Sequence, residues 1–186
     1  PYTIGDYLSD DIRTGAIPTD LPEFEAAEQN VRDRIQKLMS GKGEHSVDYY
    51  HKKLGKIMWD KCGMSRNAKD LKEAIAEIAE LRADFWENVK VTGEAEAKNQ
   101  ELEKAGRVAD FLEFGEFMIR DALAREESCG CHLREESQTE DSEALRDDDN
   151  YSHVSVWEFK GDDQAPEMHK EPLVFEHVTP SQRSYK

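Results

Sequence analysis

The stretch from Asn67 to Phe85 constrains the fold most, because its apolar residues recur at the spacing of a single helix face. Asn67 can cap a helix, and Asp70 lies where a negative charge favours the helix dipole. The alanine-rich run EAIAEIAELRA also has high helix propensity. The sequence therefore predicts an amphipathic helix, whose apolar face other elements must cover. The apolar positions of that face are Leu71, Ala74, Ile75, Ile78, Leu81 and Phe85.

Two segments before this stretch show the same periodicity. In the first, Thr19 or Asp20 lies near the expected cap and Pro22 lies in the first turn. Its expected core positions are Phe24, Ala27, Val31, Ile35 and Leu38. The second segment begins at Ser46 and stops at Gly63. Its expected core positions are Val47, Tyr50, Leu54, Ile57 and Met58.

A fourth helix is expected from about residue 94 to residue 127. Gly106 and Gly115 lie within it, and each glycine allows a neighbouring helix to approach closely. We therefore predict an antiparallel bundle of three to four helices over residues 21–127. The inward positions of the fourth helix are Leu102, Ala105, Val108, Leu112, Gly115, Ile119 and either Ala122 or Leu123.

The chain changes character after residue 127. An acidic segment comes first, followed by two alternating runs, HVSVWEF at 153–159 and PLVFEHV at 172–178. These runs predict an antiparallel hairpin with a long loop between them. The predicted fold class is therefore mainly α, with an irregular C-terminal arm and a small β-hairpin in residues 128–186. Residues 1–20 are expected to hold a short helix or turn and a linker.

The composition excludes two classes of partner or location. The formal net charge is −16, which argues against a nucleic acid partner, because phosphates attract Lys and Arg. No apolar run reaches the roughly 20 residues that a membrane-spanning helix needs. The three cysteines are odd in number and unevenly placed, which favours a reducing compartment over a secreted disulfide framework.

Cys129, Cys131 and His132 form the most conspicuous cluster of reactive residue types. A c-type haem needs Cys-x-x-Cys-His, and this spacing is one residue short. Structural zinc needs four ligands, so Cys62 would have to fold back to complete the site. A disulfide between residues two apart is strained. We favour the alternative that Gly130 marks a backbone turn and that no metal binds here.

Other chemistry is sparse in this sequence. The six histidines (His45, His51, His132, His153, His169 and His177) are scattered, and no catalytic triad can be identified from their order. The acidic run RDDDN at 146–150 is interpreted as a solvated loop rather than a cation site. Neither glycine-rich phosphate-binding motif is present. We therefore assign no catalytic, cofactor-binding or metal-ligating residue to this chain.

Two segments resemble the C-terminal region of the succinate dehydrogenase and fumarate reductase flavoprotein subunits. ALAREESCGCHLR at 122–134 is similar to the family's A-x-x-R-x-E-S-R-G-x-H-x-R, although Cys129 stands where the family has Arg. LGKIMWDKCGMSRNAKDL at 54–71 is similar to its L-x-x-x-M-W-x-x-x-G-x-x-R-x-x-x-x-L segment. The R-D-D run and the closing P-x-x-R-x-Y, at Pro180, Arg183 and Tyr185, also fit. The resemblance implies a structural, interdomain motif made of Arg125, Glu127, Ser128, Gly130, His132, Arg134, Arg146, Asp147 and Asp148.

The resemblance also implies a function. The full-length family members interconvert succinate and fumarate by hydride transfer at FAD. They pass electrons to an iron–sulfur subunit and then to a membrane quinone-reactive subunit, peripheral to the cytoplasmic side of the inner membrane. The implied partners within the same chain are FAD-binding and capping domains, and residues 1–20 would be the tail of the FAD-binding domain and a linker. This segment alone is then expected to be inactive and to hold no cofactor.

Two alternatives remain at the sequence level. One is an independent acidic helical interaction module that resembles the family only in helical composition. The other is the matching domain of a flavoprotein like L-aspartate oxidase, which shares the E-S-R-G-x-H element. The R-D-D continuation and the R-x-Y end favour the respiratory enzymes.

Overall fold

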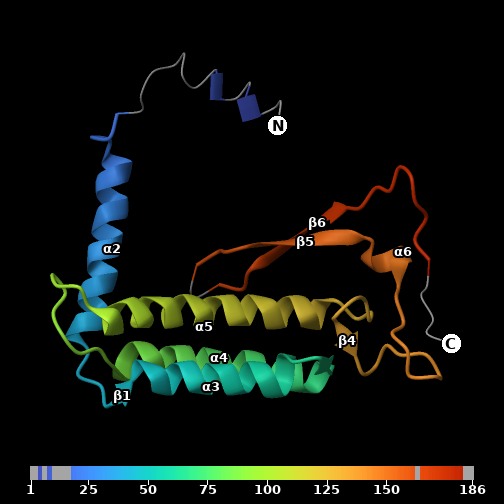
Figure 1. The fold of residues 1–186 in the computed structure, drawn as a ribbon, viewed down its shortest axis with the longest axis horizontal. Coiled ribbons are helices and arrows are strands. Elements are labelled where there is room, and N and C mark those ends of the chain that lie inside the picture. Colours follow the sequence, from blue (N-terminus) through green and yellow to red (C-terminus); the bar gives the residue numbers. More distant parts are fainter. Residues whose placement is uncertain (1–3, 6–7, 10–17, 162–163, 182–186) are drawn as a thin grey trace.

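The computed structural model describes residues 4–5, 8–9, 18–161 and 164–181, and four long helices dominate it (Figure 1). They are α2 (Pro22–Ser40), α3 (Val47–Cys62), α4 (Ala68–Asn88) and α5 (Gln100–Ala124). A short helix, α6 (Asp148–Tyr151), precedes a hairpin of β5 (His153–Glu158) and β6 (Glu167–Pro172). The two-residue strands are β1 (His45–Ser46), β2 (Ser65–Arg66), β3 (Val89–Lys90) and β4 (Leu133–Arg134). The predicted mainly α fold with a C-terminal arm and a small hairpin is confirmed.

Helices α3, α4 and α5 alternate in direction and pack into a three-helix bundle (Figure 1). Ser46, Asn67 and Asn99 cap their first turns, each accepting a hydrogen bond from a backbone N–H three residues on. The core is made of the apolar faces predicted for these helices. Its largest fully buried side chains include Tyr50, Phe85, Leu71, Ile78, Leu112, Ile119 and Val47.

Helix α2 corrects one prediction. Its apolar stripe was expected in the core, yet Phe24 is 47% exposed, Val31 is 58% exposed, and only Leu38 is buried. The reason is its direction: α2 runs away from the end of the bundle, so only its last turns reach the other helices (Figure 1). Its N-cap is Leu21, without a side-chain cap, so neither Thr19 nor Asp20 serves. The predicted helix or turn in residues 1–12 falls largely outside the residues that the structure describes.

The boundaries and glycines of α5 differ in detail from the prediction. The helix begins at Gln100 rather than near residue 94, because Asn99 caps it and Gly93 has a φ of 94°. Gly115 does sit at a close approach, since an added Cβ would lie 3.4 Å from the Met58 sulfur and 3.5 Å from Leu54 Cδ1. Gly106 faces open space. Only Gly115 therefore serves helix packing.

Short parallel strands connect the ends of the bundle to its loops. Strand β1 pairs with β3, which joins the α2–α3 connection to the end of α4. Strand β2 pairs with β4, with Arg66 opposite Arg134. This second pair attaches the C-terminal arm to the α3–α4 connection, so the arm starts from a fixed position beside the bundle.

The hairpin corrects a second prediction. The first strand lies where it was expected, but its partner is Glu167–Pro172 and not the apolar run at 172–178. His153 pairs with Pro172 and Glu158 with Glu167. Leu173, Val174 and Phe175, which suggested a strand, are exposed. The hairpin buries little of its own surface, so hydrophobic alternation does not set its register.

Candidate functional site at the end of helix α5

The residues of the C-terminal motif gather where α5 ends. After α5 ends at Ala124 and residues 125–128 follow, the chain makes a tight turn from Cys129 to His132, closed by backbone hydrogen bonds of 2.9 Å and 3.1 Å between these two residues. Gly130 has a φ of 61°, as the first central residue of a type II′ hairpin turn requires. The turn sends the chain back along the end of α5, so the motif side chains face the helix terminus.

Arg134 occupies the centre of this cluster and is 3% exposed. Its Nη1 donates to the carbonyls of Ala122 at 3.0 Å, Leu123 at 3.2 Å and Arg125 at 3.1 Å. Its Nε donates to Glu136 at 3.1 Å. The last carbonyls of a helix have no intrahelical partner, and a cation there also complements the helix dipole. Arg134 therefore acts as the C-terminal cap of α5.

His132 links the turn to two other elements. Its Nε2 lies 2.8 Å from the carbonyl oxygen of Arg125, and its Nδ1 lies 2.8 Å from Nη1 of Arg66. Because Arg66 can only donate, this geometry requires a neutral imidazole with the proton on Nε2. Burial lowers the pKa of His132, and the nearby arginines lower it further. With both ring nitrogens occupied, His132 is held as a connecting residue.

Ser128 and Glu127 fix the arm from the inside. The buried Ser128 hydroxyl accepts a hydrogen bond from the Arg134 N–H at 2.8 Å and donates to the Arg134 carbonyl. Glu127, 4% exposed, pairs with Arg125 at 2.6 Å and accepts the N–H of Asp147 at 2.8 Å. The segment around residue 147 is therefore attached to the end of α5.

The remaining motif residues organise the approach to the hairpin. Arg125 donates to the carbonyls of Tyr151 at 3.1 Å and His153 at 3.0 Å. Arg146 pairs with Asp148 and donates to the carbonyl of Ser181 at 3.0 Å. Asp147 caps α6 by accepting the N–H of Asn150. Together these contacts connect the arm, the short helix and the first strand.

The structure brings together all nine predicted motif residues and adds Arg66 from the α3–α4 connection. No site role is predicted for Arg66, although it matches the arginine of the family segment at 54–71, and that match could have indicated one. No buried side-chain nitrogen or oxygen in the described part of the chain lacks a partner. A small cavity of about 180 Å³ lies beside His132, lined also by Cys62, Arg66 and Arg125. Because the buried polar groups of the described residues satisfy one another, the cluster is built to hold geometry.

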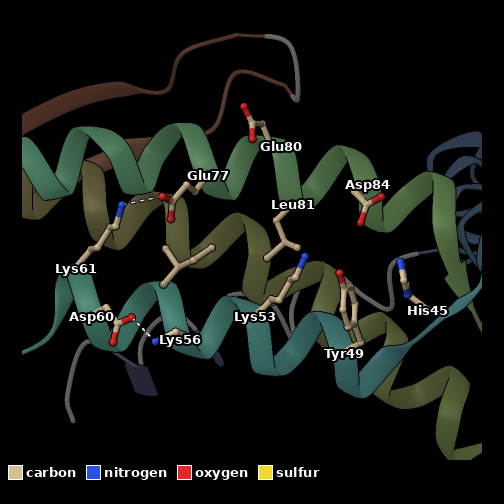
Figure 2. A pocket seen from close by; sticks show the side chains of 11 residues that line it. His45, Tyr49, Lys53, Lys56, Asp60, Lys61, Glu77, Glu80, Leu81 and Asp84 are labelled. Carbon is tan, nitrogen blue, oxygen red and sulfur yellow. Dashed lines mark hydrogen bonds and ion pairs between the residues drawn. The ribbon is translucent and has the colours of Figure 1, made fainter.

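A second hollow lies on the bundle, in a groove of about 730 Å³ between α3 and α4 (Figure 2). Lys61 pairs there with Glu77 at 2.7 Å, and Lys56 pairs with Asp60 at 2.6 Å. The Lys53 ammonium lies 4.5 Å from the centroid of the Tyr49 ring. This groove is open and mixed in charge. Its paired lysines and carboxylates balance one another's charge and do not point together at one ligand position.

One group in the described residues has metal-ligand spacing. It consists of Glu158, Glu167 and His169, all exposed on the hairpin. Lys160 already contacts Glu158 at 2.7 Å and Glu167 at 3.0 Å, which offsets part of the charge of the two carboxylates. This group is a cross-strand ion-pair network.

Comparisons with known proteins identify the class to which this fold and motif cluster belong. The chain is 30% identical over 140 residues to the fumarate reductase flavoprotein subunit of Helicobacter pylori strain J99, covering 75% of this chain and 20% of that protein. It is 26% identical over 171 residues to the same subunit of Proteus vulgaris, covering 91% of this chain and 27% of that protein. The chain thus spans about a quarter of the length of these relatives.

Solved structures share the fold. A quinol–fumarate reductase with menaquinol molecules matches with a TM-score of 0.73 at 22% identity, covering 89% of this chain and 28% of that one. The Sdh1 complex of Mycobacterium smegmatis in the apo form matches with a TM-score of 0.67 at 24% identity, covering 81% of this chain and 25% of that one.

A family model described as fumarate reductase flavoprotein C-term matches residues 51–185. The chain belongs to this family, the C-terminal region of the fumarate reductase and succinate dehydrogenase flavoproteins. The alternative of an independent module that resembles the family only in helical composition is therefore wrong. None of the described helices is long and apolar enough to cross a membrane.

Proposed function

We propose that this chain serves as the C-terminal domain of a flavoprotein subunit that interconverts succinate and fumarate by hydride transfer at FAD. The observation that carries the proposal is the match of residues 51–185 to the family model. The motif cluster at the end of α5 supports it, because Arg125, His132 and Arg134 hold the arm and the helix terminus together through hydrogen bonds. The domain's own part is structural: it presents a rigid helical bundle with a fixed arm.

The described residues do not fit the FAD cofactor that the family implies. Binding of a dinucleotide pyrophosphate uses a glycine-rich turn between a parallel strand and a helix. Here the parallel pairs are two residues long, and β1 leads into α3 through Ser46 and Val47 rather than through a glycine-rich turn. FAD therefore belongs to other domains of a full-length subunit, and the nine motif residues act on it only by holding the arm, through contacts between domains.

The proposed assembly follows from this assignment. The FAD-binding and capping domains of the same subunit would be the first neighbours of the bundle. An iron–sulfur subunit would accept the electrons and pass them to a membrane quinone-reactive subunit. The flavoprotein subunit would be peripheral, on the cytoplasmic side of the inner membrane. Structural neighbours that are quinol–fumarate reductase and succinate dehydrogenase complexes support membership of a complex.

A second candidate function is that of a flavoprotein like L-aspartate oxidase. The observation in its favour is 24% identity over 128 residues to the L-aspartate oxidase of Synechocystis sp.. Both functions place a flavin in the same kind of parent protein, so the substrate distinguishes them.

The test uses the protein from the longest reading frame that contains these residues. Purified, it should retain flavin, reduce a dye with succinate, and oxidise a reduced viologen with fumarate. Oxidation of L-aspartate without activity on succinate would establish the second candidate instead. A preparation without flavin and without either activity would overturn both.

A further inference from the structure

Two of the three cysteines lie outside the role just proposed. Cys129 and Cys131 are exposed, whereas Cys62 is buried in the bundle and 6% exposed. Ser128 and His132, the neighbours of this pair in sequence, are both buried and form hydrogen bonds with other residues of the chain. The turn thus points its two thiols outward while its ends are anchored.

We propose that Cys129 and Cys131 are a site of reversible oxidation, in which a low-molecular-weight disulfide converts the two thiols into one intrachain disulfide. Cys129 stands where the resembling family motif has Arg, so the pair belongs to this chain and not to the motif's structural role. The proposal is independent of the flavin chemistry, because the small disulfide supplies the oxidising equivalents.

The backbone brings the two residues within range. Two residues along a chain advance at most about 7 Å, and a disulfide takes Cα atoms about 4.4–6.8 Å apart. The positive φ of Gly130 turns the chain between them, which shortens the distance below that of an extended strand. Apart from Cys129 and Cys131 themselves, no described residue has an atom within 4 Å of the position that a Gly130 Cβ would take, so the turn has room to adjust.

A basic residue, Arg146, lies near the turn. The guanidinium of Arg146 lies close enough to couple to Cys129: its pKa is raised chiefly by the hydrogen bond to Asp148 and also by charges that include Cys129. Thiolates are the attacking species in disulfide exchange, and neighbouring arginines stabilise them. Arg146 is already paired with Asp148, so its charge acts on Cys129 as a neighbour and not as a bonded partner.

The exchange proceeds in two balanced steps. One protein thiolate attacks the small disulfide, which forms a mixed disulfide and releases one small thiolate. The second protein thiolate then attacks the mixed disulfide, which closes the Cys129–Cys131 bond and releases the other small thiolate. The two protein sulfurs lose two electrons, and the small disulfide gains them to become two thiols. A disulfide that is strained and exposed is easily reduced again, which makes the step reversible.

The experiment equilibrates the 186-residue chain in glutathione buffers of graded oxidised-to-reduced ratio, then alkylates free thiols and measures intact mass. We expect Cys129 and Cys131 to lose their reactivity together, so that the oxidised chain carries no alkyl group and no glutathione on either residue. Its mass should be two hydrogens below that of the reduced, unmodified chain. Dithiothreitol should restore both. Cys62, which is buried, should be alkylated only after unfolding.

Cys129→Ser and Cys131→Ser are the matched controls, each leaving one exposed thiol in the same turn. Each should carry one glutathione under oxidising conditions, because no second thiol can displace it. Circular dichroism should show the same helix content as the wild type. The proposal is overturned if the wild-type chain carries one glutathione on each exposed thiol, or if neither thiol reacts.

Discussion

At the scale of single residues, Arg134 carries the largest share of the contacts at the end of α5. Replacing it with Met keeps much of the side-chain volume but removes the Arg134 donor from the carbonyls of Ala122 and Leu123, while the carbonyl of Arg125 keeps the His132 Nε2–H. We expect Arg134→Met to lower the free energy of unfolding by about 3 kcal/mol. Denaturant unfolding measures this, and hydrogen exchange should show faster exchange over residues 128–150.

Arg107 supplies the control for this substitution. It pairs with Glu103 on the exposed surface of the same helix, where an ion pair adds less than about 1 kcal/mol. Arg107→Met should therefore leave stability within about 0.5 kcal/mol of the wild type. Equal losses for the two variants would show that Arg134 contributes no more than a surface charge.

His132 makes stability depend on pH. Because burial lowers its pKa from 6.5, the folded chain binds the proton more weakly than the unfolded chain does. Its contribution to stability is therefore complete above about pH 6.5 and is lost as the pH falls from there through the folded-state pKa. His132→Gln keeps a donor and an acceptor but cannot titrate. The difference in unfolding free energy between the two proteins should shrink as the pH falls from about 7.5 to 5.

The carboxylates of the chain titrate in both proteins, so only the difference between them reports on His132. Two stability curves that stay parallel over this range would show that the imidazole does not change its charge environment on folding.

At the scale of elements, α5 offers a matched pair of positions. Leu112 is fully buried among the three helices, and Phe114, two residues on, is 63% exposed. Leu112→Asp places an unpaired charge in the core and should cost more than about 4 kcal/mol, enough to prevent cooperative folding. Phe114→Asp should change stability by less than about 0.5 kcal/mol. Thermal melting followed by circular dichroism distinguishes the two.

The helices also show how much of the fold the sequence could predict. The three bundle helices were correct in existence and buried face, and α4 also in its Asn67 cap, because each joins local propensity to an apolar stripe that a neighbour covers. Helix α2 also formed where it was expected, but periodicity records only that a face is apolar. The exposed positions of Phe24 and Val31 depend on the direction of α2 relative to the bundle, which no local pattern contains.

For the motif cluster, the sequence indicated the residues but not their contacts. The resemblance selected Arg134 and His132, but the residues alone did not indicate that one caps α5 or that Arg66 reaches the other from 66 positions away. Those contacts depend on the pairing of β2 with β4, two strands too short for any sequence pattern to detect. The second hairpin strand was misplaced for a related reason, since backbone pairing and not burial sets its register.

At the scale of the whole molecule, the arrangement of elements predicts that this chain does not bind FAD by itself. A flavin dinucleotide needs a helix N-terminus and a glycine-rich turn at the end of a parallel strand to hold its pyrophosphate. In the described residues, Lys56 and Lys61 of the groove between α3 and α4 already pair with Asp60 and Glu77, so their charges are balanced within the groove (Figure 2). The chain mixed with excess FAD and passed through gel filtration should elute without absorbance at flavin wavelengths. The protein from the longest reading frame, treated in the same way, should elute yellow. Flavin that stays with the 186-residue chain would show that this domain holds a cofactor site of its own.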